Sequence, residues 1–182
     1  TALLSYWGFS WEADEDEFFV GKRELTTAGN IPKPIQTGFE MLARLKEQRL
    51  EVMRSRKDNR FGLMATKSEE DTLTFIAYNY DETDNQLEKL DELMITVKGL
   101  KKNSKVRISE ISMDRINNNT YRTWEQEGKP SSSSGVDISA IEKSGVLKST
   151  NDYLIETNDE GSAKLKLSLI RHSMKLIELN YE

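Results

Sequence analysis

The sequence predicts a mainly β protein, an antiparallel β-sandwich preceded by one strand–helix unit of the α/β type. Two observations lead to this fold class. The chain opens with a nearly continuous apolar and aromatic run over residues 3–10, which a loop separates from a helical pattern. After residue 50 the hydrophobic period changes from 3.6 to 2, and short alternating segments follow one another with turn residues between them.

The opening run is too continuous for a strand with one solvated face. Residues 3–10 read Leu-Leu-Ser-Tyr-Trp-Gly-Phe-Ser, which is typical of a strand buried on both faces, as in a parallel sheet covered by helices. An acidic loop and an Ile-Pro-Lys-Pro segment follow. The helical pattern then places four apolar side chains on one stripe: Ile35, Phe39, Leu42 and Leu45. No second unit of this kind occurs in the sequence.

The remaining residues, 49–182, are predicted to form the sandwich. Alternating apolar residues predict strands at 73–78, 93–98, 106–110, 164–169 and 174–179, with weaker candidates at 51–56 and 61–66. Turns around Gly161 and at Arg171–His172 predict a C-terminal meander of adjacent strands. Residues 136–143 fit either a short helix or a strand.

Composition excludes several classes of function. Hydrophobic residues make up 36% of the 182 residues, charged residues 31%, and the net charge is −5. Nucleic acids and anionic membranes are bound by clustered Lys and Arg, so we expect neither as a partner. Cysteine is absent, which excludes disulfides and thiolate metal sites. No metal or other cofactor is predicted, and no run approaches the ~20 apolar residues of a membrane-spanning helix.

Two polar candidates are weak. His172 is the only histidine and stands at a predicted turn between polar residues, so we expect no catalytic or metal-binding role. Asp81, Asp84 and Asn85 suggest calcium by residue type. However, the Gly and the distal Glu of an EF-hand loop are missing, and a solvated hairpin tip explains them better.

Four aromatic side chains form a further candidate. They could stack on sugars, but aromatic residues interleaved with apolar strand residues are more typical of a sandwich core or a domain interface. The four are Tyr78, Tyr80, Tyr121 and Trp124.

Three segments, in this order, carry a resemblance to a known family. They are the Ser-Tyr-Trp-Gly-Phe-Ser of residues 5–10, the helix opening at Ile31–Pro34, and residues 114–130, where Asp, Asn and aromatic residues lead to Trp124 and a Gly-Lys-Pro. They resemble the last barrel strand, the last barrel helix and the following stretch of the family 39 glycoside hydrolases. That family includes β-xylosidases and α-L-iduronidases.

The resemblance implies a fold and a chemistry. Residues 1–48 would be the eighth strand and helix of a (β/α)₈ barrel, and residues 49–182 a β-sandwich beside it. Retaining enzymes of this family use one Glu as general acid/base and another as nucleophile, about 5 Å apart. Both stand on earlier barrel strands in the family, and nothing in this sequence matches their motifs. We therefore expect no catalytic residue in this chain and no activity of the chain alone.

The resemblance also implies substrate-binding residues, because barrel active sites lie at the C-terminal ends of the strands. Trp7 would stack on a sugar ring, with core packing as the alternative. Glu12 or Glu15 would accept hydrogen bonds from sugar hydroxyls, with a solvated acidic loop as the alternative. Residues 19–24 replace the His-Gly-Gly-Phe-Gly stretch of the xylosidases, which weakens the implication of xylose specificity. The basic pair at residues 22–23 could instead face a uronic-acid carboxylate.

Two hypotheses on function follow. The chain is the C-terminal part of a retaining glycosidase whose partners are the missing N-terminal barrel portion and, through it, a carbohydrate. Alternatively, it is a free-standing carbohydrate-binding or adhesion sandwich, which would show an exposed aromatic row on one sheet face. Under the first hypothesis residues 3–9 lack their neighbouring strands, and we expect them to pair within the chain or with a second copy.

Overall fold

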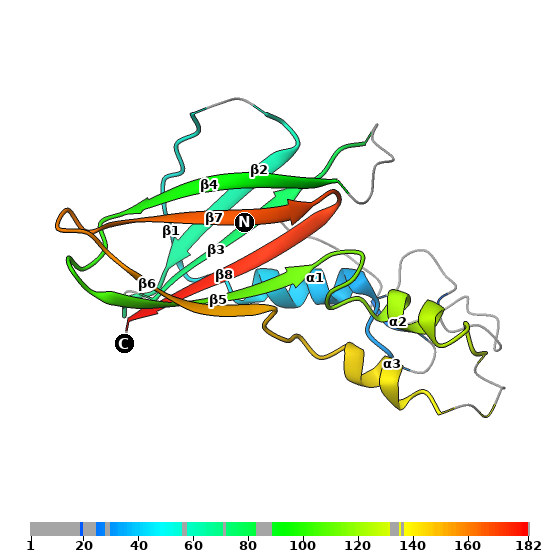
Figure 1. Cartoon of the computed structure of the whole chain (residues 1–182). Coiled ribbons are helices and arrows are strands. Elements are labelled where there is room, and N and C mark those ends of the chain that lie inside the picture. Colours follow the sequence, from blue (N-terminus) through cyan, green and yellow to red (C-terminus); the bar gives the residue numbers. More distant parts are fainter. Residues whose placement is uncertain are drawn as a thin grey trace. The chain divides into compact units, whose positions relative to one another are not determined.

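A computed structural model describes residues 19, 25–27, 30–55, 58–70, 72–82, 89–131, 135 and 137–181 (Figure 1). The predicted strand at residues 3–10 lies outside these residues. The described chain divides into two compact units. One contains the residues up to Glu40 together with Arg115–Lys148, and the other contains Met41–Asp114 and Ser149–Glu182. Among the described residues, no helix has the length and apolar character needed to cross a membrane.

The fold is mainly antiparallel β, as predicted. The helices are α1 (Pro34–Ala43), α2 (Thr120–Gln126) and α3 (Ser139–Ser144). The strands are β1 (Gln48–Arg49), β2 (Phe61–Lys67), β3 (Leu73–Asn79), β4 (Leu90–Lys98), β5 (Lys105–Met113), β6 (Asn151–Glu156), β7 (Ser162–Ile170) and β8 (Ser173–Tyr181).

The strands form two sheets that share one core. The larger sheet has the order β1-β2-β3-β8-β5-β6, and β4 pairs with β7 in a separate two-stranded sheet. Every pairing is antiparallel, for example Phe75 opposite Ile177. Apolar side chains of both sheets meet in a buried cluster that includes Phe75, Ile108, Leu167 and Ile177. The period-2 pattern of β4 and β7 thus reflects one inner and one outer face, whereas central residues of β3 and β8 are buried on both faces. The two sheets packed on one core confirm the predicted β-sandwich.

Two details of the sequence prediction are wrong. The C-terminal strands form no meander, because β7 pairs with β4 whereas β8 lies between β3 and β5. The apolar sides of β7 and β8 face each other across the core, so the turn at Arg171–His172 carries the chain from one sheet to the other. Residues 51–55 form no strand, and Met53 is 80% exposed, which leaves that segment without an apolar face to bury.

The first unit contains an insertion, Arg115–Lys148, between the paired strands β5 and β6. The Asn119 side chain caps α2 by accepting a hydrogen bond from the N–H of Arg122, at 3.1 Å. Gly128, with φ +82°, ends the helix, and the N–H of Lys129 donates to the carbonyl of Trp124. This bond, together with the one from the N–H of Gly128 to the carbonyl of Glu125, forms a Schellman motif at the C-terminal end of α2. Residues 139–144 resolve the ambiguous segment as helix α3.

Candidate functional site

The predicted substrate-binding residues lie outside the part of the chain that the structure describes. Trp7, Glu12 and Glu15 all belong to residues 1–18, and their role stays a prediction. The sites that can be built from geometry are therefore the polar clusters of the sandwich and the aromatic cluster of the insertion.

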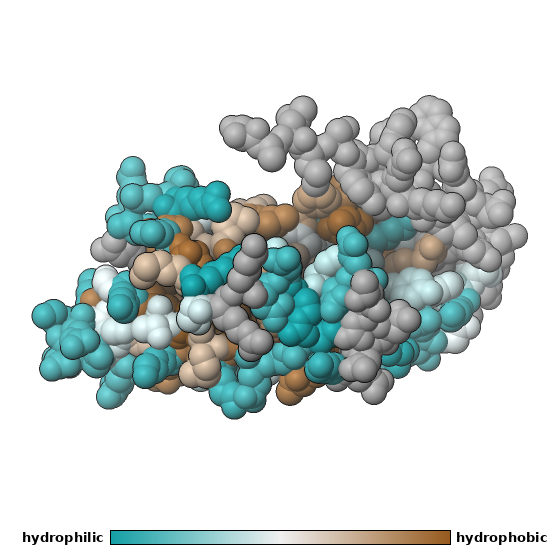
Figure 2. Space-filling view, turned by 90° about the horizontal axis from the view of Figure 1, so that it is seen from above, coloured by the Kyte–Doolittle hydropathy of each residue, from teal (hydrophilic) through white to brown (hydrophobic). Residues whose placement is uncertain are grey.

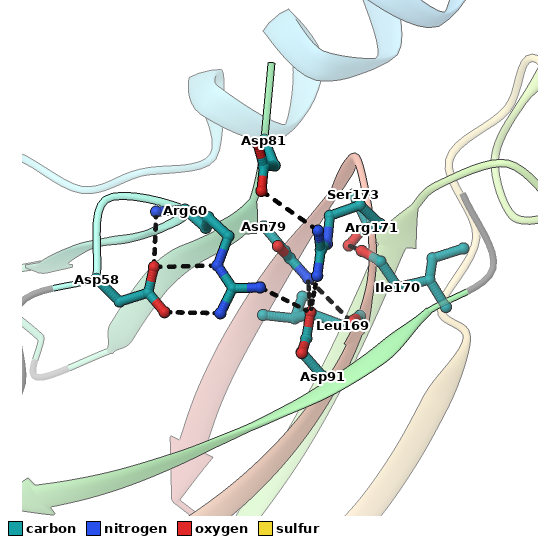
Figure 3. Close-up of polar contacts among 9 residues, drawn as sticks. All are labelled: Asp58, Arg60, Asn79, Asp81, Asp91, Leu169, Ile170, Arg171 and Ser173. Atoms are coloured by element: carbon teal, nitrogen blue, oxygen red, sulfur yellow. Dashed lines mark hydrogen bonds and ion pairs between the residues drawn. The ribbon is translucent and has the colours of Figure 1, made fainter. Parts of the chain in front are cut away.

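A charged cluster closes one end of the sandwich (Figure 3). Its centre is Arg171, in the turn between β7 and β8, whose side chain is 1% exposed. The guanidinium donates to Asp91 at 3.0 Å and to Asp81 at 3.4 Å. The backbone N–H of Arg171 donates to the carbonyl of Lys89 at 3.0 Å. One residue thereby binds both ends of the connection between β3 and β4.

Two further side chains extend this cluster (Figure 3). The amide of Asn79, a fully buried residue, donates to Asp91 at 3.0 Å and to the carbonyl of Leu169 at 3.3 Å. Arg60 lies 3.9 Å from Asp91, and its guanidinium makes two hydrogen bonds to Asp58, at 3.1 and 2.8 Å, beside a third from its backbone N–H at 3.1 Å. The hydrogen bond with Asp58 is the main cause that raises the pKa of Arg60. The carboxylates of Asp58, Asp81 and Asp91 are thus paired with guanidinium groups. Such ion pairs hold the connecting loops in place, and they do not form the two facing carboxyl groups of a glycosidase active site.

A second buried ion pair lies on the inner face of the larger sheet. The ammonium of Lys175 on β8 is 2.7 Å from Glu110 on β5, and the two side chains are 11% and 6% exposed. The hydroxyl of Tyr153 on β6 donates to the other oxygen of Glu110 at 2.9 Å. Burial, followed by this bond to a carboxylate, raises the pKa of Tyr153. The three groups satisfy one another within the sheet, as buried charges require.

The four candidate aromatic residues belong two to each unit. Tyr121 and Trp124 of α2 lie 5.4 Å apart and both contact the ring of Phe19, at 5.5 and 5.2 Å. The indole N–H of Trp124 donates to the carbonyl of Pro130 at 2.9 Å. Tyr121 and Trp124 are therefore part of the packing within the first unit. Tyr78 and Tyr80 belong to the sandwich and are 44% and 53% exposed.

Two ionisable candidates have structural roles. His172 stands in the left-handed conformation of a turn, with φ +57°, and its ring meets that of Tyr80 edge-on at 5.3 Å. Asp81 binds Arg171, whereas Asp84 and Asn85 lie outside the described residues. In the part of the chain that the structure describes, no three His, Asp or Glu side chains gather as a metal site.

Sequence reasoning missed the two buried charge clusters, although a signal for them existed. Asp91 is in phase with the inward-facing leucine, isoleucine and valine of β4, and Asn79 is in phase with Phe75 and Ala77 of β3. Lys175 is likewise in phase with Ile177. A polar residue at an inward position of an alternating strand must find a buried partner, and that rule would have identified these positions.

Residues 3–149 match the glycosyl hydrolases family 39. No curated protein sequence matches the chain.

Solved structures of low sequence identity share the fold. A bacterial orthologue of human α-L-iduronidase is 15% identical, with a TM-score of 0.68, over 84% of this chain and 28% of that chain. A monomeric β-xylosidase from Caulobacter crescentus is 16% identical, with a TM-score of 0.69, over 90% and 34%. An enzyme of the same family from Xanthomonas axonopodis pv. citri is 10% identical, with a TM-score of 0.67, over 86% and 32%.

The chain therefore spans about a third of the length of these enzymes. Because the family match covers most of the sequence and the sandwich matches these enzymes in fold, the chain belongs to glycoside hydrolase family 39.

Proposed function

We propose that this chain is the C-terminal part of a retaining glycosidase that hydrolyses β-xylosidic or iduronidic bonds. The observation that carries the proposal is the family match over residues 3–149 in a chain that spans only about a third of related enzymes. On this proposal the sandwich supports a catalytic barrel, and the acid/base and nucleophile glutamates, about 5 Å apart, stand on that barrel. The chain alone is inactive.

Residues 1–48 provide this chain's contribution to the substrate site. As the last strand, loop and helix of the barrel, they bring Trp7 to the end of a strand, where its ring stacks on a sugar. Glu12 and Glu15 in the following loop accept hydrogen bonds from sugar hydroxyls. These contacts orient the sugar, and the chemistry of the bond is left to the barrel glutamates.

The rival function, a free-standing carbohydrate-binding sandwich, calls for an aromatic row on one sheet face. On the outer face of the larger sheet, the described strands bring one aromatic side chain, Tyr78, into line with Gly62, Met174 and Met113. The outer positions of β4 and β7 carry Leu, Met, Thr, Ser, Ile and charged residues. Neither face has the expected row, and this supports the glycosidase proposal over its rival.

The first experiment is the mass of the native protein in its source cells, detected with an antibody against this chain. We expect a polypeptide longer by a full barrel, with activity on aryl β-xylosides or aryl α-L-iduronides. Cleaving the intact enzyme before Arg49 should lower its stability and activity, because the barrel loses its support. A native mass equal to that of this chain would overturn the proposal.

Variants of the whole enzyme test the three substrate residues. Trp7→Ala should lower kcat/KM at least ~10-fold, a loss of about 1.4 kcal/mol in transition-state stabilisation. Glu12→Gln and Glu15→Gln test the hydroxyl contacts, and Glu47→Gln, at an exposed position beyond α1, is the matched control. Equal kcat/KM for all four variants and the parent would exclude the three residues from the site.

A further inference from the structure

The outer face of the β4–β7 sheet carries lysine on both of its strands. Alternate residues of β7, with Leu167 at their centre, point into the core, so the residues between them form the outer face. On this face β7 presents Lys164 and Lys166, and β4 presents Lys98. All three residues are exposed and belong to the same compact unit. The three ammonium groups therefore share one solvent-facing surface.

We name this surface the lysine face. It consists of four outer residues of β4 and the four that pair with them on β7: Glu92, Met94, Thr96 and Lys98, opposite Ser168, Lys166, Lys164 and Ser162. Besides the ammonium groups, these side chains include the hydroxyls of one Thr and two Ser, one thioether and one carboxylate. The lysine face is therefore rich in hydrogen-bond donors and carries an excess of positive charge.

The positive charge is only partly balanced. The carboxylate of Glu92 lies 2.7 Å from the ammonium of Lys166, and both side chains are more than half exposed. An exposed ion pair of this kind contributes little to stability, so an anionic ligand can take the place of Glu92. Within the part of the chain that the structure describes, Lys98 and Lys164 form no ion pair.

Stability does not explain this arrangement. Like charges on neighbouring positions of a sheet are unfavourable, and opposite charges would stabilise the pair of strands. Charge does protect open sheet edges from aggregation, but residues of mixed sign give the same protection without repulsion. Figure 2 shows hydrophilic side chains, with hydrophobic ones between them, over much of the surface in view. Hydrophilic character is thus general, and the single sign of the charge distinguishes the lysine face.

The excess charge is confined to the sheet. Beyond Lys98, the β4–β5 turn has lysine at positions 101 and 102, whereas the β6–β7 turn has Asp159 and Glu160. The two turns lie together, because the N–H of Leu100 donates to the carbonyl of Gly161 at 2.9 Å. Charges of both signs therefore meet at this end of the sandwich, and the lysine face ends there.

The composition of the lysine face fits an anionic polysaccharide. Ammonium groups bind carboxylates or sulfates through charge-assisted hydrogen bonds, and the hydroxyl of Thr96 can bond sugar hydroxyls. Met94, which is 63% exposed, offers an adaptable apolar contact to the carbon–hydrogen side of a sugar ring. Single-stranded nucleic acids, in contrast, are bound with aromatic side chains that stack on the bases, and the lysine face has no aromatic residue.

We propose that the lysine face binds an anionic polysaccharide, the polymer that contains the sugar to be hydrolysed. The choice of a polysaccharide rests on the proposed function, and the inference adds a second contact for the polymer, on the sandwich. Iduronic acid carries a carboxylate, so polymers that contain it or other uronic acids are polyanions. A second contact on the same molecule raises the effective concentration of the polymer at the enzyme.

Binding to the chain of 182 residues tests the proposal. Isothermal titration calorimetry measures it with dermatan sulfate, with the same polymer after chemical desulfation, and with neutral arabinoxylan. We expect dermatan sulfate to bind with an affinity that falls as salt is added, and arabinoxylan not to bind. Binding that survives desulfation assigns the contact to carboxylates, and binding that is lost assigns it to sulfates. No binding of either polyanion, or equal binding of a DNA duplex or of phosphatidylserine vesicles, would overturn the proposal.

Paired variants identify the residues. Lys164→Gln with Lys166→Gln should weaken dermatan sulfate binding at least ~5-fold, because two exposed ion pairs with the ligand are lost. The matched control, Lys143→Gln with Lys148→Gln, removes the same charge from exposed positions of the other unit and should change the affinity less than ~2-fold. Glu92→Gln should strengthen binding about twofold, since it removes a repelling carboxylate. Equal weakening by the two lysine pairs would mean that net charge alone sets the affinity, and would overturn the lysine face.

Kinetics of the native enzyme separate this inference from the proposed function. In the variant with Lys164→Gln and Lys166→Gln, the ratio of KM for the polymer to KM for an aryl glycoside should rise about fivefold. An unchanged ratio, in an enzyme active on aryl glycosides, would overturn the lysine face and leave the glycosidase proposal intact. A native protein without glycosidase activity would overturn the proposed function, whereas calorimetry with the chain of 182 residues would still decide whether the lysine face binds polyanions.

Discussion

The sandwich and the insertion between β5 and β6 fix their connections by different chemistry. In the sandwich, Arg171 binds Asp81, the carbonyl of Lys89 and Asp91, and so closes the β3–β4 connection with buried charge. In the insertion, the Asn118 amide donates to the carbonyl of Lys148 at 3.0 Å and accepts from its N–H at 2.9 Å. That neutral pair joins the first turn of the insertion to its end.

This difference predicts how each region responds to a lost partner. Removing one member of a buried charge pair leaves an uncompensated charge, which costs far more than the pair contributes. Removing a neutral, solvent-accessible partner lets water replace the lost bonds, so the cost is that of ordinary hydrogen bonds. The sandwich should therefore be sensitive to single substitutions in its clusters, and the insertion should tolerate them.

The largest effect is expected for Arg171→Met in the isolated chain. The substitution leaves Asp81 and Asp91 without their guanidinium and should lower the free energy of unfolding by about 3–5 kcal/mol. Urea denaturation followed by far-ultraviolet circular dichroism, which reports on the strands of the sandwich, measures it. The control is Lys166→Met, which removes an exposed partner of Glu92, with side chains 57% and 55% exposed, and should cost below about 1 kcal/mol. Similar losses for both variants would show that burial does not set the cost.

A slightly smaller effect is expected at the inner-face pair. Lys175→Met leaves Glu110 buried beside Tyr153 and should cost about 3 kcal/mol. Replacing both members, as Lys175→Met with Glu110→Leu, should recover most of that loss, because an apolar pair of similar volume needs no solvation. The double-mutant cycle is measured by urea denaturation. A double variant less stable than Lys175→Met would mean that Glu110 stabilises the fold without its lysine.

These clusters also show how far the sequence could predict the structure. The sandwich strands follow from alternation alone, because a strand with one buried face must repeat every two residues. Neighbours in the sheets do not follow: β7 and β8 are adjacent in sequence and carry the same pattern, yet they lie in different sheets. Only packing across the core decides this, and a local pattern contains no record of it.

The candidate site was predictable in a more limited way. Asn79, Asp91 and Lys175 stand at inward positions of their strands, so the sequence pattern indicated that these polar side chains are buried. The partner of Asp91 was not predictable, because Arg171 comes from a turn, where no periodicity applies. The partner of Lys175 was not predictable either, because Glu110 stands on a strand that is distant in the sequence. The insertion was predicted least, since α2 depends on the Asn119 cap and the Gly128 terminus and carries little apolar periodicity.

The insertion should show a smaller and local effect. Asn118 has φ +47°, so Asn118→Gly removes the amide without backbone strain. We expect a loss of about 1–2 kcal/mol for two hydrogen bonds, seen as roughly tenfold faster hydrogen exchange at the N–H of Lys148. The N–H of Ile177, in the centre of β8, is the reference and should exchange at an unchanged rate. Faster exchange at both sites would mean that the two regions unfold as one.

The smallest expected effect is a difference between the sandwich and the insertion in how a tyrosine makes the stability depend on pH. Burial and the bond to Glu110 raise the pKa of Tyr153 in the folded chain, so above about pH 10 the unfolded chain loses this proton first. Stability from this residue is therefore complete below pH 10 and declines as pH rises, with a slope below about 1.4 kcal/mol per pH unit for a half-buried group. Tyr153→Phe should cost about 1 kcal/mol at pH 7 and flatten the alkaline decline, whereas Tyr121→Phe in the insertion should retain it. Parallel curves of urea midpoint against pH for Tyr153→Phe and the parent chain would place the alkaline sensitivity elsewhere.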